Sequence, residues 1–300
     1  MGLFGFNYAK PGPGVDANEP EKKGFFRFWE IIFEKFGKLL GLNTIHAILS
    51  IVYLVILFVI APVSDTWLTQ LAQDASKDPE AVQMIAFTFT TMMRAIFAVG
   101  IFMLWGSGPS SAAYAYISRC FVRRDPVWII SDGKDKIKEN FKQSIIVTVI
   151  DIAVLFLSFN AMLFYNGMFT RSGNIFFMML TSLMVMMFIV YTWMHFYIYQ
   201  LMVTFECSLK QLYKNALIFA VAALPMNLFL TILALVVLAS LFFFLNPFFA
   251  VIIDLILLPI LMRFPIEFYA ARKIKKVAIG DDEKPAIQHE YFPEPEEEIK

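Results

Sequence analysis

The stretch IFFMMLTSLMVMMFIVYTWMHFYIYQLMV, residues 175–203, contains no Asp, Glu, Lys or Arg and is long enough to cross the hydrocarbon core of a bilayer as an α-helix. The chain as a whole is 59% apolar and has a mean hydropathy of +0.65, more apolar than is usual for a soluble domain. The sequence therefore predicts an all-α, polytopic membrane bundle with six transmembrane helices. The other five apolar runs are residues 44–63, 84–105, 145–164, 216–242 and 247–262.

The 25 Lys and Arg residues are sorted by position relative to these runs. Lys77 lies between runs one and two and Arg171 between runs three and four, in connections that would face outward, and Arg94 lies within a run. All the others precede the first run, follow the sixth, or lie between runs two and three or four and five. By the positive-inside rule, both termini are expected in the cytoplasm. Cys120 and Cys207 would then lie at cytoplasmic helix ends, where thiols stay reduced.

Four segments are predicted along the chain. Residues 1–23 are rich in Pro and Gly and are expected to form a flexible cytoplasmic lead. Residues 24–43 are expected to form an amphipathic helix in the membrane interface. Residues 44–276 are expected to form the six-span domain, and residues 277–300 are expected to form an acidic cytoplasmic tail. A helix packed on the inner loops is the alternative for residues 24–43. Its apolar side would carry Phe25, Phe28, Trp29, Ile32, Phe36 and Leu39.

A weak internal repeat precedes spans three and five. Lys138, Phe141 and Lys142 have the same spacing as Lys210, Tyr213 and Lys214. Three αα-hairpins in one orientation would produce such a repeat. The alternative is that each inner helix end independently carries Lys and aromatic anchors.

Residues 106–143 form the longest predicted cytoplasmic connection and are the predicted contact loop for another protein. Gly106, Gly108 and Pro109 are expected to end the second span, and a helix can resume over residues 110–122. Ser131 and Asp132 predict the N-cap of a basic helix that leads into span three. The predicted contact residues are Tyr114, Arg119, Arg123, Arg124, Trp128 and Asp132.

Two motifs can be followed along the chain. The first starts at Gly108-Pro109 in this loop and continues through Trp128 and residues 138–143, and it includes Ala112, Ala113, Tyr114, Arg119, Ser131 and Asp132. The second is residues 208–219. Together these motifs resemble those of the YesL-like family of integral membrane proteins. The chain departs from the family at Gly133, where an aromatic residue often follows the Ser-Asp pair.

The resemblance implies a bacterial, mainly Gram-positive, protein of the cytoplasmic membrane. Members of that family have no assigned biochemical activity and no established catalytic residues. They are often encoded beside sugar ABC importers and polysaccharide-degrading enzymes. An association with carbohydrate uptake, with ABC permease subunits and their ATPase as partners, is what the resemblance implies for this chain.

Three charged residues fall within predicted spans, where ionisable groups are costly and are functional candidates. Arg94 would lie about 15 Å deep, and Asp151 and Asp254 about 10 Å deep from opposite sides, at about 1.5 Å per residue. One or both carboxylates could pair with Arg94 as a polar pathway. The alternative is a structural salt bridge that fixes helix register. His46 and His195 are expected to be anchors at the level of the lipid headgroups.

The sequence lacks the motifs of the common catalytic and nucleic-acid-binding classes. It has no phosphate-binding Gly-rich loop, nucleophile elbow or zinc-ligand spacing, and its basic loops suit lipid headgroups better than nucleic acid. The sequence therefore predicts a non-enzymatic protein without cofactors that contacts membrane lipids. The leading hypothesis is an accessory or regulatory subunit of a carbohydrate ABC importer. The alternative is an autonomous small-solute carrier or channel that uses Arg94 with Asp151 or Asp254, and a homo-oligomer is a further option.

Overall fold

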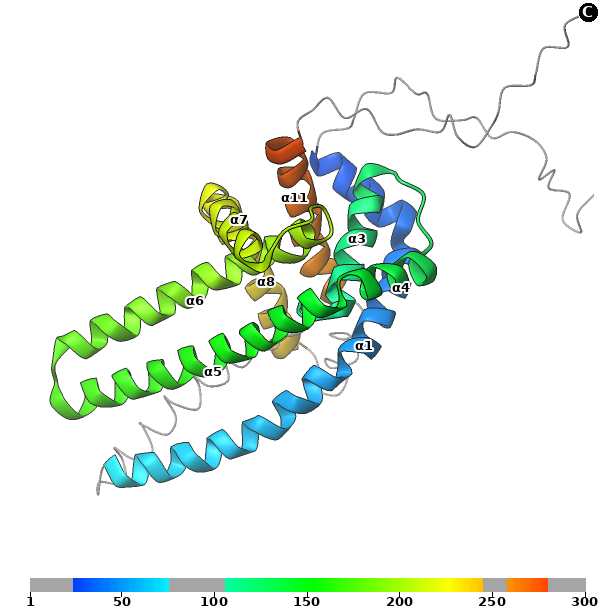
Figure 1. Cartoon of the computed structure of the whole chain (residues 1–300). Helices are drawn as coiled ribbons and strands as arrows, with labels where there is room; N and C mark the ends of the chain where they lie inside the picture. Colours follow the sequence, from blue (N-terminus) through cyan, green and yellow to red (C-terminus); the bar gives the residue numbers. More distant parts are fainter. Residues whose placement is uncertain (1–23, 76–105, 245–257, 280–300) are drawn as a thin grey trace, which may run out of the picture.

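The computed structural model describes residues 24–75, 106–244 and 258–279, and every element within them is helical (Figure 1). The predicted second span, most of the sixth, Arg94 and Asp254 lie outside the described residues, as do the lead and nearly all of the acidic tail. The elements are α1 Gly24–Ala75, α3 Pro109–Arg123, α4 Ile129–Glu139, α5 Phe141–Ser172, α6 Ile175–Met202, α7 Leu209–Ala222, α8 Leu224–Phe244, α10 Leu258–Leu261, α11 Arg263–Ile274 and the π-helix η1 Lys275–Ile279.

Helices α5 and α6 form an antiparallel hairpin that projects from the rest of the molecule (Figure 1). Both are long and apolar enough to cross a membrane, and their bounds contain predicted span three and nearly all of span four. The turn between them is tight because Gly173 adopts a left-handed conformation, φ 63°, and the Asn174 side chain accepts a hydrogen bond from the Phe176 amide. This is the one predicted αα-hairpin that the described residues contain in full.

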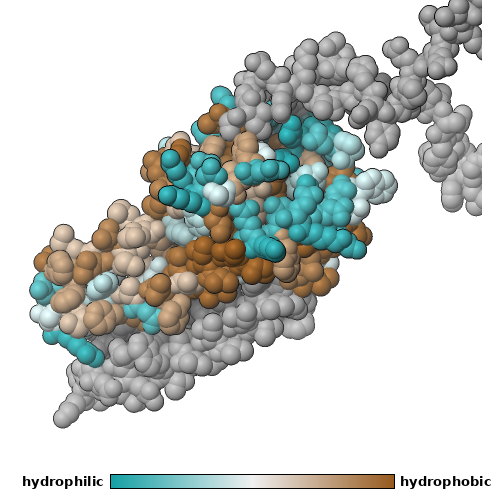
Figure 2. All heavy atoms as spheres, in the orientation of Figure 1, coloured by the Kyte–Doolittle hydropathy of each residue, from teal (hydrophilic) through white to brown (hydrophobic). Residues whose placement is uncertain are grey.

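The surface of the molecule divides along the axis of this hairpin. Hydrophilic side chains gather at the end where α3, α4, α7 and α11 meet, whereas hydrophobic ones cover α5 and α6 (Figure 2). Large apolar side chains on the hairpin, such as Phe156, Phe164 and Met179, are exposed. Such a surface suits a lipid environment rather than water.

Helix α1 joins two segments that the sequence analysis separated. It runs without a break from Gly24 to Ala75, which corresponds to about 78 Å at about 1.5 Å per residue. Its first part has two apolar faces: Ile31, Leu39 and other side chains pack against α3 and α11, whereas Trp29 and Phe33 are exposed. The predicted single apolar side is therefore divided between protein contact and an exposed aromatic face.

Arg27 lies on the buried side of α1. Its Nη1 donates to Glu30 Oε2 at 2.7 Å, and its Nη2 donates to the Phe121 carbonyl at 3.1 Å. That carbonyl belongs to the last turn of α3, where no later helical N–H is available to it. Arg27 thus joins α1 to the C-terminus of α3.

Predicted span five, residues 216–242, is not one straight helix. Helices α7 and α8 meet at Ala223 with a bend of 87°, next to Pro225, which has no N–H to continue the helical ladder. Asn227 bridges the break, since its Nδ2 donates to the Ala220 carbonyl and its Oδ1 accepts from the Tyr197 hydroxyl at 2.6 Å. The described residues therefore contain two candidate spans, or three if this bent pair is one broken span.

The basic helix starts earlier than predicted: its N-cap is Trp128, whereas Ser131 and Asp132 were the predicted cap. Helix α4 begins at Ile129, so Ser131 and Asp132 lie within its first turn. Asp132 nevertheless serves the helix N-terminus, because its Oδ2 accepts a hydrogen bond from the Trp128 amide at 2.8 Å. The helix stops at Glu139, and α5 starts after Asn140 with a change of direction (Figure 1).

Candidate functional site

Asp151 lies at the centre of a buried polar cluster between α5, α6 and the segment before α3. Its side chain is 0% exposed. Oδ2 accepts from the Ser107 hydroxyl at 2.5 Å and lies 3.0 Å from His195 Nε2, while Oδ1 accepts from the Tyr191 hydroxyl at 2.6 Å. Because a carboxylate only accepts hydrogen bonds, His195 donates through Nε2.

The cluster extends through hydroxyl groups on both sides of Asp151. Ser107 Oγ is 3.0 Å from Thr148 Oγ1 and 3.2 Å from the Tyr199 hydroxyl. The Tyr199 hydroxyl also accepts from the Gly108 amide at 2.6 Å, which ties α6 to the start of α3. Tyr191 reaches Tyr213 of α7 at 3.5 Å, with the two rings stacked. Asp151 of α5 therefore contacts α6 and the segment before α3 directly, and it is linked to α7 through Tyr191.

His195 is a buried partner of Asp151 rather than a headgroup anchor. Its side chain is 7% exposed, and its ring packs edge-on against Tyr199 with centroids 5.5 Å apart. A histidine and a carboxylate in contact within membrane helices can exchange a proton or hold helices in register. The sequence carried a signal for this arrangement, since Tyr191, His195 and Tyr199 recur every four residues and lie on one face of α6.

A second buried cluster surrounds Arg263 and Glu267 of α11. The Arg263 guanidinium donates to Glu267 Oε1 at 3.4 Å and lies over the Tyr114 ring, 4.2 Å from its centroid. It also donates to His46 Nε2, so the neutral His46 ring carries its proton on Nδ1. His46 is therefore a buried acceptor that joins α1 to α11, which corrects its assignment as a headgroup anchor.

Glu267 is compensated from both sides of its carboxylate. Gln200 Nε2 donates to Oε2 at 2.7 Å and also to the Ala115 carbonyl at 2.9 Å. Burial nevertheless raises the pKa of Glu267 above its usual range, against the opposing influence of the Arg263 charge. Since Gln200 directly follows Tyr199 in α6, the two clusters are adjacent and form one buried polar layer at the hydrophilic end of the hairpin.

Tyr114 does not belong to the contact surface predicted for residues 106–143. Its side chain is 0% exposed, because α3 turns it inward against Arg263 and His46. Tyr114, Ile117 and Phe121 lie on one side of α3, and this side packs on α1 and α11. An aromatic residue on a predicted cytoplasmic helix carries no sequence signal that distinguishes these two environments.

The three predicted basic contacts, Arg119, Arg123 and Arg124, have different surroundings. Arg119 donates to Thr204 Oγ1 at 2.7 Å, and burial lowers the pKa of its guanidinium. Arg119 and Arg123 line a small cleft together with Arg272 and Lys275. Arg124 is exposed in a left-handed conformation at the end of α3, and its Nη2 lies 3.5 Å from Glu30 Oε2.

Trp128 is the most exposed of the predicted contact residues. Its side chain is 78% exposed at the start of α4, and Ile130 next to it is 76% exposed. The Asp132 carboxylate fixes the backbone at this position through the Trp128 amide. The loop therefore presents a large apolar residue on a rigid helix start, flanked by the Lys residues of α4.

Comparisons of the chain with models of protein families, with curated proteins and with solved structures find no match. Within the described ranges, no group of His, Cys, Asp and Glu side chains is arranged to hold a metal ion.

Proposed function

We propose that the protein is a six-span membrane protein with both termini in the cytoplasm, and that it acts as a non-catalytic accessory subunit of a larger membrane assembly. The observation that carries this proposal is the exposed Trp128 at the start of α4. Trp residues that are held rigidly at a surface are frequent energetic centres of protein interfaces. The apolar exterior of α5 and α6 and the position of most basic residues support the membrane topology.

The proposed assembly is a carbohydrate ABC importer of the bacterial cytoplasmic membrane, with its permease pair and ATPase as partners. This part of the proposal rests on the resemblance of the loop motifs to the YesL-like family. The chain's own geometry adds a docking surface centred on Trp128, and Arg124, four residues earlier in the loop, is also exposed. The exposed part of this surface contains both an aromatic group and positive charge, a combination common at protein interfaces.

Replacing Trp128 with alanine is expected to reduce recovery of the partner subunits at least tenfold when the tagged protein is purified from native membranes in mild detergent. The fold should be unaffected because the side chain is exposed. Quantitative mass spectrometry of the purified material provides the measurement. Phe33→Ala is the control for the loss of an exposed aromatic side chain, since Phe33 is 76% exposed on a different helix, α1. Equal recovery of partners with the wild type and Trp128→Ala would refute the docking surface.

A second candidate function is supported by the contact between Asp151 and His195. A buried carboxylate and imidazole on adjacent membrane helices, extended by the Tyr191 and Tyr199 hydroxyls, can serve as a proton-exchange site of a carrier. Such a carrier would move its solute without other subunits.

The carrier hypothesis predicts solute flux in liposomes that contain this protein alone. His195→Gln retains a donor for Asp151 but cannot be protonated, so it is expected to abolish the dependence of flux on a pH gradient and to leave folding largely intact. Flux is measured with a panel of radiolabelled sugars under an imposed pH gradient. Thr192→Ser on the same helix is the control, and absence of flux in the wild type would contradict the hypothesis.

A further inference from the structure

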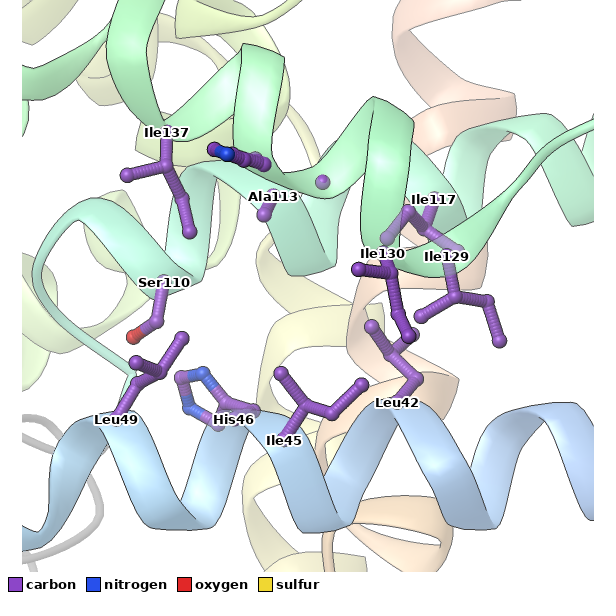
Figure 3. A pocket seen from close by; sticks show the side chains of 12 residues that line it. Leu42, Ile45, His46, Leu49, Ser110, Ala113, Ile117, Ile129, Ile130 and Ile137 are labelled. Carbon is purple, nitrogen blue, oxygen red and sulfur yellow. The ribbon is translucent and has the colours of Figure 1, made fainter.

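A cavity of about 320 Å³ lies between α1, α3 and α4. Neither Asp151 nor Glu267, the carboxylates of the two polar clusters, lines it. Figure 3 shows Leu42, Ile45, His46 and Leu49 on α1 facing Ser110, Ala113 and Ile117 on α3, with Ile129, Ile130 and Ile137 of α4 completing the wall. Its size is at the lower end of the range of small-molecule pockets. Aliphatic side chains make up most of the lining, and Lys134 contributes a positive charge.

We propose that this cavity binds one acyl chain of an anionic phospholipid, with Lys134 contacting the headgroup. A hydrocarbon chain can fill an aliphatic cavity without leaving polar atoms unpaired. A polypeptide segment in the same place would bring backbone N–H and C=O groups that need partners. His46, one of the polar lining residues, is already engaged by Arg263.

The position of the cavity gives a membrane lipid access to it. The α1 residues that line it straddle residue 44, where the predicted first span begins. Ile45 and Leu49 are partly exposed beside it, and Ile48 on the same turn is 63% exposed. Lys134 and Lys138, both exposed on α4, provide positive charge at this level, and anionic headgroups are attracted to such residues.

Gly133 lines this cavity, so a side chain at this position can reduce the cavity's volume. A Cβ added at Gly133 would lie 3.4 Å from Ile117 Cδ1 and 3.8 Å from Ala113 Cβ, which are ordinary contacts. Alanine therefore fits, whereas the longer side chain of leucine would occupy part of the cavity. Gly133→Leu and Gly133→Ala form a matched pair that differs in how much of the cavity is filled.

The experiment is native mass spectrometry of the full chain with phosphatidylglycerol or phosphatidylcholine of identical acyl composition. The wild type and Gly133→Ala are expected to retain one phosphatidylglycerol, and Gly133→Leu to retain at least tenfold less. Lys134→Gln is expected to reduce the preference for phosphatidylglycerol about fivefold, since one Lys near an anionic surface contributes about that factor.

The two variants test the proposal independently. If Gly133→Leu does not fold, as judged by its melting transition, Lys134→Gln still decides the outcome because its side chain is exposed. Equal retention of both lipids by the wild type, or an unchanged preference in Lys134→Gln, would overturn the proposal. A protein subunit found in place of lipid on the wild type but not on Gly133→Leu would likewise overturn it.

Discussion

Replacing Asp151 with alanine is expected to lower the free energy of unfolding by about 3–5 kcal/mol, because it removes the common acceptor of several hydrogen-bond donors. The substitution leaves His195, Ser107 and Tyr191 without their common acceptor, the fully buried Asp151 carboxylate. Each buried donor that loses its partner costs about 1–3 kcal/mol, so this range is consistent with the number of bonds lost. Equilibrium unfolding in mixed micelles, followed by circular dichroism, measures the change.

The control for Asp151 is Asp135→Ala on α4. Asp135 has the same side chain but is exposed, so its substitution is expected to change stability by less than about 0.5 kcal/mol. Asp151→Asn keeps the shape and an acceptor oxygen and should lose less than Asp151→Ala. Equal stability of Asp151→Ala and the wild type would show that the cluster contributes nothing to the fold.

Replacing Arg263 with methionine is expected to have a comparable effect, again about 3–5 kcal/mol, because it leaves the Glu267 carboxylate buried without its cation. It also removes the donor to His46 and the charge over the Tyr114 ring. A second substitution, Glu267→Gln, should restore at least half of the loss, since Gln still accepts from Gln200 and carries no charge. The comparison Arg171→Ala, at the exposed end of α5, should be close to neutral.

The effect of Arg263→Met should depend on pH in a defined direction. Burial already raises the pKa of Glu267, and loss of Arg263 removes the main influence that opposes this rise. The native state then holds a proton that the unfolded state has released, so stability falls as pH rises between the two pKa values. Melting curves should show a smaller deficit at about pH 5 than at about pH 8. An equal deficit at both values, or a larger one at the lower pH, would show that Glu267 is not the group left uncompensated.

The candidate spans were predictable because their signal is local. Helix α6 ends one residue before the end of the predicted run 175–203, and α5 contains all of predicted span three. A long apolar run with few or no charges specifies a membrane helix without reference to its neighbours. The break between α7 and α8 has a local cause as well, the nearby Pro225. The size of the bend, 87°, does not follow from the proline alone. The opposite holds for Tyr114 and Arg27, which look suited to a surface and are buried by contacts with distant segments.

Local sequence accounts for the helical class, the apolar character of the hairpin and the polar face of α6, because each depends on residues within a few turns. Which polar groups meet depends instead on tertiary packing. Asp151 and His195 are 44 residues apart, and Arg263 and His46 are 217 apart. Burial makes each of these groups require a partner, but the packing of α1, α3, α5, α6 and α11 determines which partner is within reach.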